Sequence, residues 1–148
     1  MKENASNIQQ IISLIQEHCP EKPIIITLSP VPLSATFREI SCIVADCASK
    51  SILRTAIDEV FRSKPLNTFY WPAFEIVKWC GPHLPYPTYG VTYPSKNITT
   101  CRQVSRQTVD LIIGTFLTHY FSGVSLDKSA NSDGFWAKAK GLISRIFG

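Results

Sequence analysis

The sequence lacks long apolar runs and paired cysteines. Proline, serine or a charged residue interrupts each apolar stretch before it approaches the roughly 20 residues that a membrane-spanning helix needs. The five cysteines are odd in number and none belongs to a C-x-x-C pair, which favours reduced thiols and predicts neither a metal site nor a cofactor. The polar start, residues 1–6, carries no apolar signal core, so a cytoplasmic protein is expected.

An excess of one charge sign is also missing over most of the chain. The formal net charge is only +4, and the lysines and arginines of the first hundred positions are scattered without forming a stripe. Proteins that bind nucleic acid concentrate their positive charge on one face, so nucleic acid is not an expected partner. The one local excess lies at the C-terminus, where three basic residues follow the last acidic residue, Asp133: Lys138, Lys140 and Arg145.

The residues that are present are typical of a folded α/β protein. With 148 residues, 45% of them apolar and 18% charged, the chain has the size and composition of about one globular domain with one core. Apolar residues at helical spacing predict an amphipathic helix over residues 4–18: Ile8, Ile11, Ile12 and Ile15. The β-branched run 24–28, bounded by prolines, predicts a buried strand of a parallel sheet. The proline-rich residues 29–33 predict a loop after this strand.

Further along, residues 40–45 are expected to form a short extended piece, and Ser49 to cap a helix that continues to Phe61. The aromatic run 67–74 predicts a second buried strand, interrupted at Pro72.

Residues 79–94 contain four prolines and predict an irregular loop. A last amphipathic helix is expected over 105–121 with Ser105 as its cap.

Three segments resemble the GSCFA family. They are residues 27–33 with 35–37, then 45–46 leading to 49–54, and then 69–76, within a resemblance that runs from about residue 5 to residue 121. The family is similar to SGNH (GDSL-like) hydrolases, whose α/β/α fold carries serine-based esterase or acyl-transfer chemistry. The resemblance therefore implies a partial three-layer α/β/α fold, SGNH- or flavodoxin-like, with a short parallel sheet and flanking helices.

The resemblance also implies a division of the chain. Residues 1–121 correspond to the C-terminal half of a GSCFA-like domain, 122–134 are small and polar and form a linker, and 135–148 form an amphipathic C-terminal helix. The earlier half of the family's domain, which carries the Gly-Ser-Cys-Phe-Ala motif and its nucleophile, has no counterpart in this sequence. In the family's last catalytic block, the positions of the Asp and of the His three residues later correspond to Thr100 and Gln103, and neither residue can act as a general base near neutral pH.

Three other residues are weak catalytic candidates. His83 lies in the proline-rich segment, where Glu75 could orient its imidazole for base work; the alternative is an exposed loop histidine. Glu75 is itself a candidate functional carboxylate; the alternative is that it has only a structural hydrogen-bonding role. Ser29 follows the first strand, at the end of the sheet where α/β crevices form, but no Gly-x-Ser-x-Gly motif surrounds it, so it is expected to shape a site and not to act as nucleophile.

The expected helix start at Ser49 is a candidate anion site. Its unpaired N–H groups and the neighbouring Lys50 suit the binding of a phosphate or carboxylate. The residues of this candidate anion site are Ser49, Lys50, Ser51 and Arg54. The alternative is an ordinary helix cap with a solvated Lys50.

The C-terminal segment is a candidate for a membrane surface. Its apolar and basic residues lie on opposite faces of the expected helix, and those that would meet an anionic bilayer are Phe135, Trp136, Lys138, Lys140 and Arg145. The alternative, which we favour, is that the apolar face packs on the domain or on a partner.

The leading hypothesis for function is a GSCFA-type domain fragment that is catalytically incomplete, is not an enzyme as an isolated chain, and serves as a binding or assembly module. Half of a parallel sheet leaves a strand edge with unpaired backbone groups, so self-association, or docking to a second chain that carries the missing half, is expected. One alternative is a chain of a split esterase or acyltransferase acting on acyl esters of surface polysaccharide. The other is a membrane-surface adaptor that uses the C-terminal helix.

Overall fold

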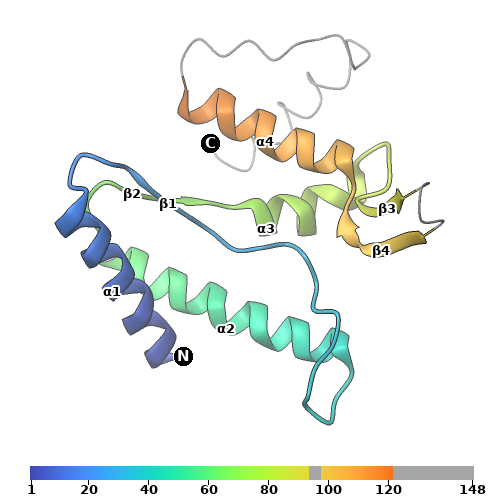
Figure 1. The fold of residues 1–148 in the computed structure, drawn as a ribbon, viewed down its shortest axis with the longest axis horizontal. Helices are drawn as coiled ribbons and strands as arrows, with labels where there is room; N and C mark the ends of the chain where they lie inside the picture. Colours follow the sequence, from blue (N-terminus) through green and yellow to red (C-terminus); the bar gives the residue numbers. More distant parts are fainter. Residues whose placement is uncertain (94–97, 122–148) are drawn as a thin grey trace. The chain divides into compact units, whose positions relative to one another are not determined.

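The computed structural model of the chain describes residues 1–93 and 98–121. It contains two compact units, Met1–Pro72 and a second one that begins at Ala73 (Figure 1). The predicted linker 122–134 and C-terminal helix 135–148 lie outside the described residues, and the single domain predicted over 1–121 stays a prediction. No helix in the described ranges combines the length and the apolar character needed to cross a bilayer.

The first unit is a small α/β structure. Its elements in chain order are α1 (Lys2–His18), β1 (Ile24–Thr27), α2 (Cys42–Arg62) and β2 (Thr68–Trp71). The two strands pair in parallel, with Ile24 opposite Thr68 and Thr27 opposite Trp71. Within this unit, α1 and α2 lie on the same side of the strands (Figure 1). The predicted α/β class, with a short parallel sheet and flanking helices, is therefore confirmed, and the first unit supplies two of the three predicted layers.

The core of this unit lies where α1, α2 and β1 meet. Ile12 of α1, Ile24 of β1 and Val60 of α2 are buried against one another, and Ile8 and Ile26 pack at the edge of the cluster. Ile24 and Ile26 are two positions apart, so both point to the same face of the strand. On β2 the aligned Tyr70 makes an edge-to-face contact with Phe61 of α2, with ring centroids 6.1 Å apart. The helices therefore cover the face that carries Ile24, Ile26 and Tyr70.

Helix α2 begins earlier than the sequence pattern predicts. Ser41 is its cap, and its Oγ accepts a hydrogen bond of 3.3 Å from the N–H of Val44. The predictions of an extended piece over 40–45 and of a helix cap at Ser49 are therefore wrong. Both Ser41 and Ser49 precede apolar residues at helical spacing, so local sequence alone does not choose between them; contacts with the preceding loop favour the earlier start.

The second unit opens with a continuous helical segment. It consists of α3 (Ala73–Glu75), a π-helical stretch η1 (Ile76–Cys80) and a 3₁₀ turn η2 (Gly81–His83). The strand predicted over 67–74 therefore ends at Trp71, because Pro72 cannot donate a ladder hydrogen bond and the chain turns helical directly after it. Gly81 packs closely against Thr88, since a Cβ atom at Gly81 would lie 2.5 Å from Thr88 Cγ2.

A hairpin and a helix complete the described part of the second unit. Strands β3 (Tyr89–Tyr93) and β4 (Ile98–Val104) pair antiparallel. The irregular loop predicted over 79–94 is therefore wrong at the helical residues 79–83 and at β3, and its last residue, Pro94, lies outside the described residues. Helix α4 (Arg106–Tyr120) confirms the last predicted helix and its cap, because Ser105 Oγ accepts from the N–H of Thr108 at 3.3 Å. The most deeply buried side chains of this unit belong to Ile76, Val77, Cys80, Thr108 and Leu111.

Candidate functional site

The loop that follows β1 holds Ser29 at the carboxyl end of the parallel strands, as the sequence predicts. Ser29 is exposed, and its Oγ accepts a hydrogen bond of 3.3 Å from the N–H of Val31. This bond is local to the loop and orients no base toward the hydroxyl. The structure therefore gives Ser29 a position suited to shaping a site, without the adjacent base that activates a serine nucleophile.

Two side chains of α2 hold this loop in place. The Asp46 carboxylate accepts a hydrogen bond of 2.9 Å from the N–H of Leu33, and the Cys42 thiol donates to the carbonyl oxygen of Leu33 at 3.1 Å. Both backbone groups of Leu33 are thus satisfied by the first turns of α2. The sequence pattern assigns Asp46 no role, although Asp46 lies in one of the segments that resemble the family. The signal that could have indicated its contact with Leu33 is its position shortly after the proline-rich loop 29–33.

We expect Asp46→Ala to destabilise the chain by about 1 kcal/mol, because Leu33 then loses a charge-assisted acceptor at a partly exposed position. Urea denaturation followed by circular dichroism measures the change. Asp46→Asn is the matched control, since its amide oxygen can still accept the bond, and it should lie close to the parent. An alanine variant as stable as the parent would show that the bond does not hold the loop.

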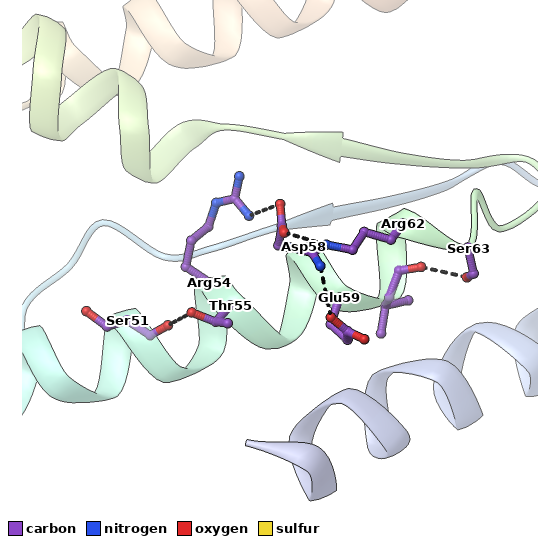
Figure 2. Close-up of polar contacts among 8 residues, drawn as sticks. Ser51, Arg54, Thr55, Asp58, Glu59, Arg62 and Ser63 are labelled. Atoms are coloured by element: carbon purple, nitrogen blue, oxygen red, sulfur yellow. Dashed lines mark hydrogen bonds and ion pairs between the residues drawn. The ribbon is translucent and has the colours of Figure 1, made fainter.

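The predicted anion site depends on a helix start that the structure does not have. Ser49, Lys50 and Ser51 lie in the interior of α2, where helical N–H groups are already bonded within the helix. The carbonyl oxygen of Ser51 accepts a hydrogen bond of 2.8 Å from Thr55 Oγ1 (Figure 2). The premise of the prediction is therefore wrong, because these residues present no unpaired N–H groups.

Arg54, the fourth member of that set, contacts two other groups. Its guanidinium carbon lies 4.8 Å from the centre of the Tyr70 ring on β2, and its Nη1 lies 3.6 Å from Asp58. Figure 2 shows Arg54 pointing toward the strands, with Asp58 between Arg54 and Arg62. A cation over an aromatic face stabilises by about 0.5–1 kcal/mol at such sites, so Arg54 links α2 to β2.

The ion pairs continue along the exposed side of α2. Arg62 Nε lies 3.2 Å from Asp58, and Arg62 Nη1 lies 3.7 Å from Glu59. The Arg62 side chain is 73% exposed, so each pair contributes only a few tenths of a kcal/mol. This network is a solvated helix face that supports the helix, with its acidic and basic groups balanced locally.

Glu75 and His83 lie at the ends of α3 and η2 in the second unit. Glu75 is half-buried and His83 is exposed. Among the described residues, no hydrogen bond or ion pair joins His83 to Glu75 or to any serine. The arrangement that would orient His83 as a general base is therefore not assembled, and the histidine has the geometry of an exposed loop residue.

Thr100 and Gln103 both lie on β4, at an irregular part of the hairpin. Val91 pairs with Thr100 while Tyr89 pairs with Val104, so residues 101–103 lie opposite Gly90 alone. Gly90 has a φ of 116°, which a residue with a side chain rarely adopts. Of the positions that the resemblance assigns to the Asp and His of the family, Thr100 thus borders this β-bulge and Gln103 lies within it; β-bulges are frequent near active sites.

The groups whose pKa values are shifted all move away from reactivity at neutral pH. Burial, with the nearby Asp110 carboxylate, raises the pKa of Tyr86 to about 12, and its hydroxyl donates to the carbonyl oxygen of Gln107 at 3.3 Å. Burial raises the pKa of the Cys80 thiol, which is 1% exposed, and also the pKa of Tyr120. Catalytic groups show the opposite tendency, because they are tuned toward the working pH.

No cluster of three or more His, Cys, Asp or Glu side chains suited to a metal ion occurs in the described residues. Cys19, Cys42, Cys47 and Cys80 are free thiols.

Comparison with known proteins gives one match. The model of the GSCFA family matches residues 1–116 of this chain. No curated protein and no solved structure matches it. The family match covers α1, both parallel strands, the hairpin and most of α4, and it includes all three segments on which the resemblance was based.

Proposed function

This chain belongs to the GSCFA family, and from that premise we propose that it is a hydrolase-like domain that lacks a complete catalytic set and serves as a binding or assembly module. The observation that carries the proposal is that an amide side chain, that of Gln103, is exposed within the bulge opposite Gly90. The resemblance assigns the Asp and His positions of the family's last catalytic block to Thr100 and Gln103. A serine hydrolase needs a nucleophile, a base within hydrogen-bonding reach and oxyanion donors, and a glutamine amide cannot take the proton.

The contacts of the family-like segments support the same proposal. The first segment joins the second through the bond from Leu33 to Asp46, and the second joins the third through Arg54 over Tyr70. The first and third also pair directly, since Thr27 lies opposite Trp71 in the parallel sheet. Each of these contacts has an architectural role: it fixes the loop, the helix and the strands relative to one another. These contacts support the part of the proposal that makes the chain an assembly module, because they maintain its α/β scaffold.

The proposal predicts that the purified 148-residue chain does not hydrolyse p-nitrophenyl acetate above the rate of a heat-unfolded sample at equal concentration. Ser29→Ala should leave the measured rate unchanged, because Ser29 has no base beside it. Initial rates at 405 nm, corrected for spontaneous hydrolysis, measure this. Thr100→Asp with Gln103→His should stay inactive as well, because an added base finds no serine positioned as a nucleophile; turnover in this variant alone would show that only the Asp and His are missing. Turnover by the parent that Ser29→Ala abolishes would refute the proposal.

A further inference from the structure

Helix α4 carries a second apolar stripe beside the face that it buries. The members of this α4 stripe follow one another at helical spacing: Val109, Ile113, Phe116 and Tyr120. Leu111 and Ile112, on the other face, are 1% and 8% exposed, whereas Val109 and Ile113 are 42% and 51% exposed. The rest of the described chain therefore leaves the first half of the α4 stripe open to solvent.

The C-terminal segment 135–148 repeats the spacing of the α4 stripe. Its apolar residues at matching intervals are Phe135, Ala139, Leu142 and Ile146. In both sets, successive residues are four, three and four positions apart, which is the spacing by which two helices pack along a shared seam. The two rows therefore have the same length and the same intervals.

The chain leaves α4 in a way that brings the C-terminal segment within reach of the stripe. Phe121, the first residue after the helix, packs its ring against Phe116, with ring centroids 6.1 Å apart. Residues 122–134 then provide thirteen positions, which is ample for two helix axes that lie about 8–10 Å apart. A segment tethered in this way has an effective concentration on the order of millimolar. A second copy or another polypeptide would have to exceed that concentration to take its place.

We propose that the C-terminal segment 135–148 forms a helix that packs antiparallel to α4 along the α4 stripe. Antiparallel packing needs only a turn after α4, whereas parallel packing needs a connection that runs back along the whole helix. The pairs in contact are Val109 with Ile146, Ile113 with Leu142, Phe116 with Ala139, and Tyr120 with Phe135. The small Ala139 thus lies opposite a large ring, as interdigitating helices require. The inference goes beyond the proposed function, because it holds whether or not the chain has catalytic activity.

This packing has a consequence for the membrane-surface alternative. A helix that lies on a bilayer buries its apolar face among the lipids. In the proposed arrangement that face, including Leu142 and Ile146, is buried against α4. The chain therefore withholds its own C-terminal segment from a bilayer.

NMR on the full 148-residue chain tests the proposal through nuclear Overhauser contacts and amide hydrogen exchange. The methyl groups of Ile113 should contact those of Leu142, and those of Val109 should contact Ile146. The amides of residues 139–146 should exchange at least about tenfold more slowly than in an unstructured peptide of the same sequence. Contacts of Val109 with Phe135 would refute the antiparallel orientation. Unprotected amides, or protected amides without contacts to Ile113, would refute the docking.

Charged variants localise the effect. Ile113→Glu places a carboxylate in the seam and should raise the exchange rates of residues 139–146 at least about tenfold. Leu142→Glu should do the same while leaving α4 itself unchanged. Gln107→Glu is the matched control: it adds the same charge at an exposed position of α4 that does not share the face of Val109, and should behave like the parent. Unchanged exchange in Ile113→Glu and Leu142→Glu would overturn the proposal.

Two further results would identify a different contact. Protection of residues 139–146 that rises with the concentration of the chain would assign the α4 stripe to a second copy. Protection that appears only with vesicles of equal parts phosphatidylcholine and phosphatidylserine would assign the segment to a membrane surface. Either result would refute docking within the chain.

Discussion

Ile12→Ala should lower the free energy of unfolding of the first unit by about 2–5 kcal/mol, the range for truncating a fully buried isoleucine. Ile12 is 0% exposed and lies against Ile24 and Val60, so it joins one strand to two helices. These elements come from separate parts of the sequence and cannot all move to fill the cavity left behind. Urea denaturation of the full chain, followed by far-ultraviolet circular dichroism, measures the loss.

Its neighbour provides the control. Ile11 has the same side chain on the same helix but is 56% exposed, so Ile11→Ala should change the stability by no more than about 0.5 kcal/mol. Ile12→Val, which removes a single methylene group, should cost about 0.5–1.5 kcal/mol. Equal effects of the two alanine variants would mean that α1 does not pack on the sheet through Ile12.

The elements that could be predicted from the sequence are those with local signals. The spacing of isoleucines in α1, the proline-bounded apolar run of β1 and the cap at Ser105 each depend on a few neighbouring residues, and the structure contains all three. The start of α2 has no such signal, because two serines are equally suitable caps. Asp46 and Cys42 bind Leu33, which lies outside the helix, and this contact between separate segments is absent from any local pattern.

The hairpin was missed for a related reason. Tyr89–Tyr93 lies between prolines that predict a loop, and β4 contains Thr100 and Gln103, which the resemblance assigns to a catalytic block and not to a strand. Antiparallel pairing depends on the match of two segments and not on either alone, so composition could not predict it. For the candidate site, the position of Ser29 at the end of β1 could be predicted. The predicted contact of Glu75 with His83 depends on an irregular loop, and the structure has a helical segment through η2 in its place.

Ser105→Ala should destabilise the second unit by about 2–4 kcal/mol, more than the loss of an ordinary helix cap. The Ser105 Oγ caps α4 through the N–H of Thr108 and also lies 2.9 Å from the Thr108 hydroxyl, with both residues almost fully buried. The variant loses the cap, at about 0.5–2 kcal/mol, and leaves a buried hydroxyl without a partner, at about 1–3 kcal/mol. Urea denaturation of the full chain measures the sum.

Two variants separate these contributions. Ser41 caps α2 with the same 3.3 Å geometry, but it is exposed and has no hydroxyl beside it, so Ser41→Ala should cost only about 0.5–1 kcal/mol. Adding Thr108→Val to Ser105→Ala removes the unpartnered hydroxyl with little change of shape, and this double variant should recover about 1 kcal/mol or more relative to Ser105→Ala alone. If Ser105→Ala cost no more than Ser41→Ala, the buried pair would contribute nothing beyond the cap. The start of α4, directly after the bulge on β4, would then depend on the backbone bond from Ser105 to Thr88.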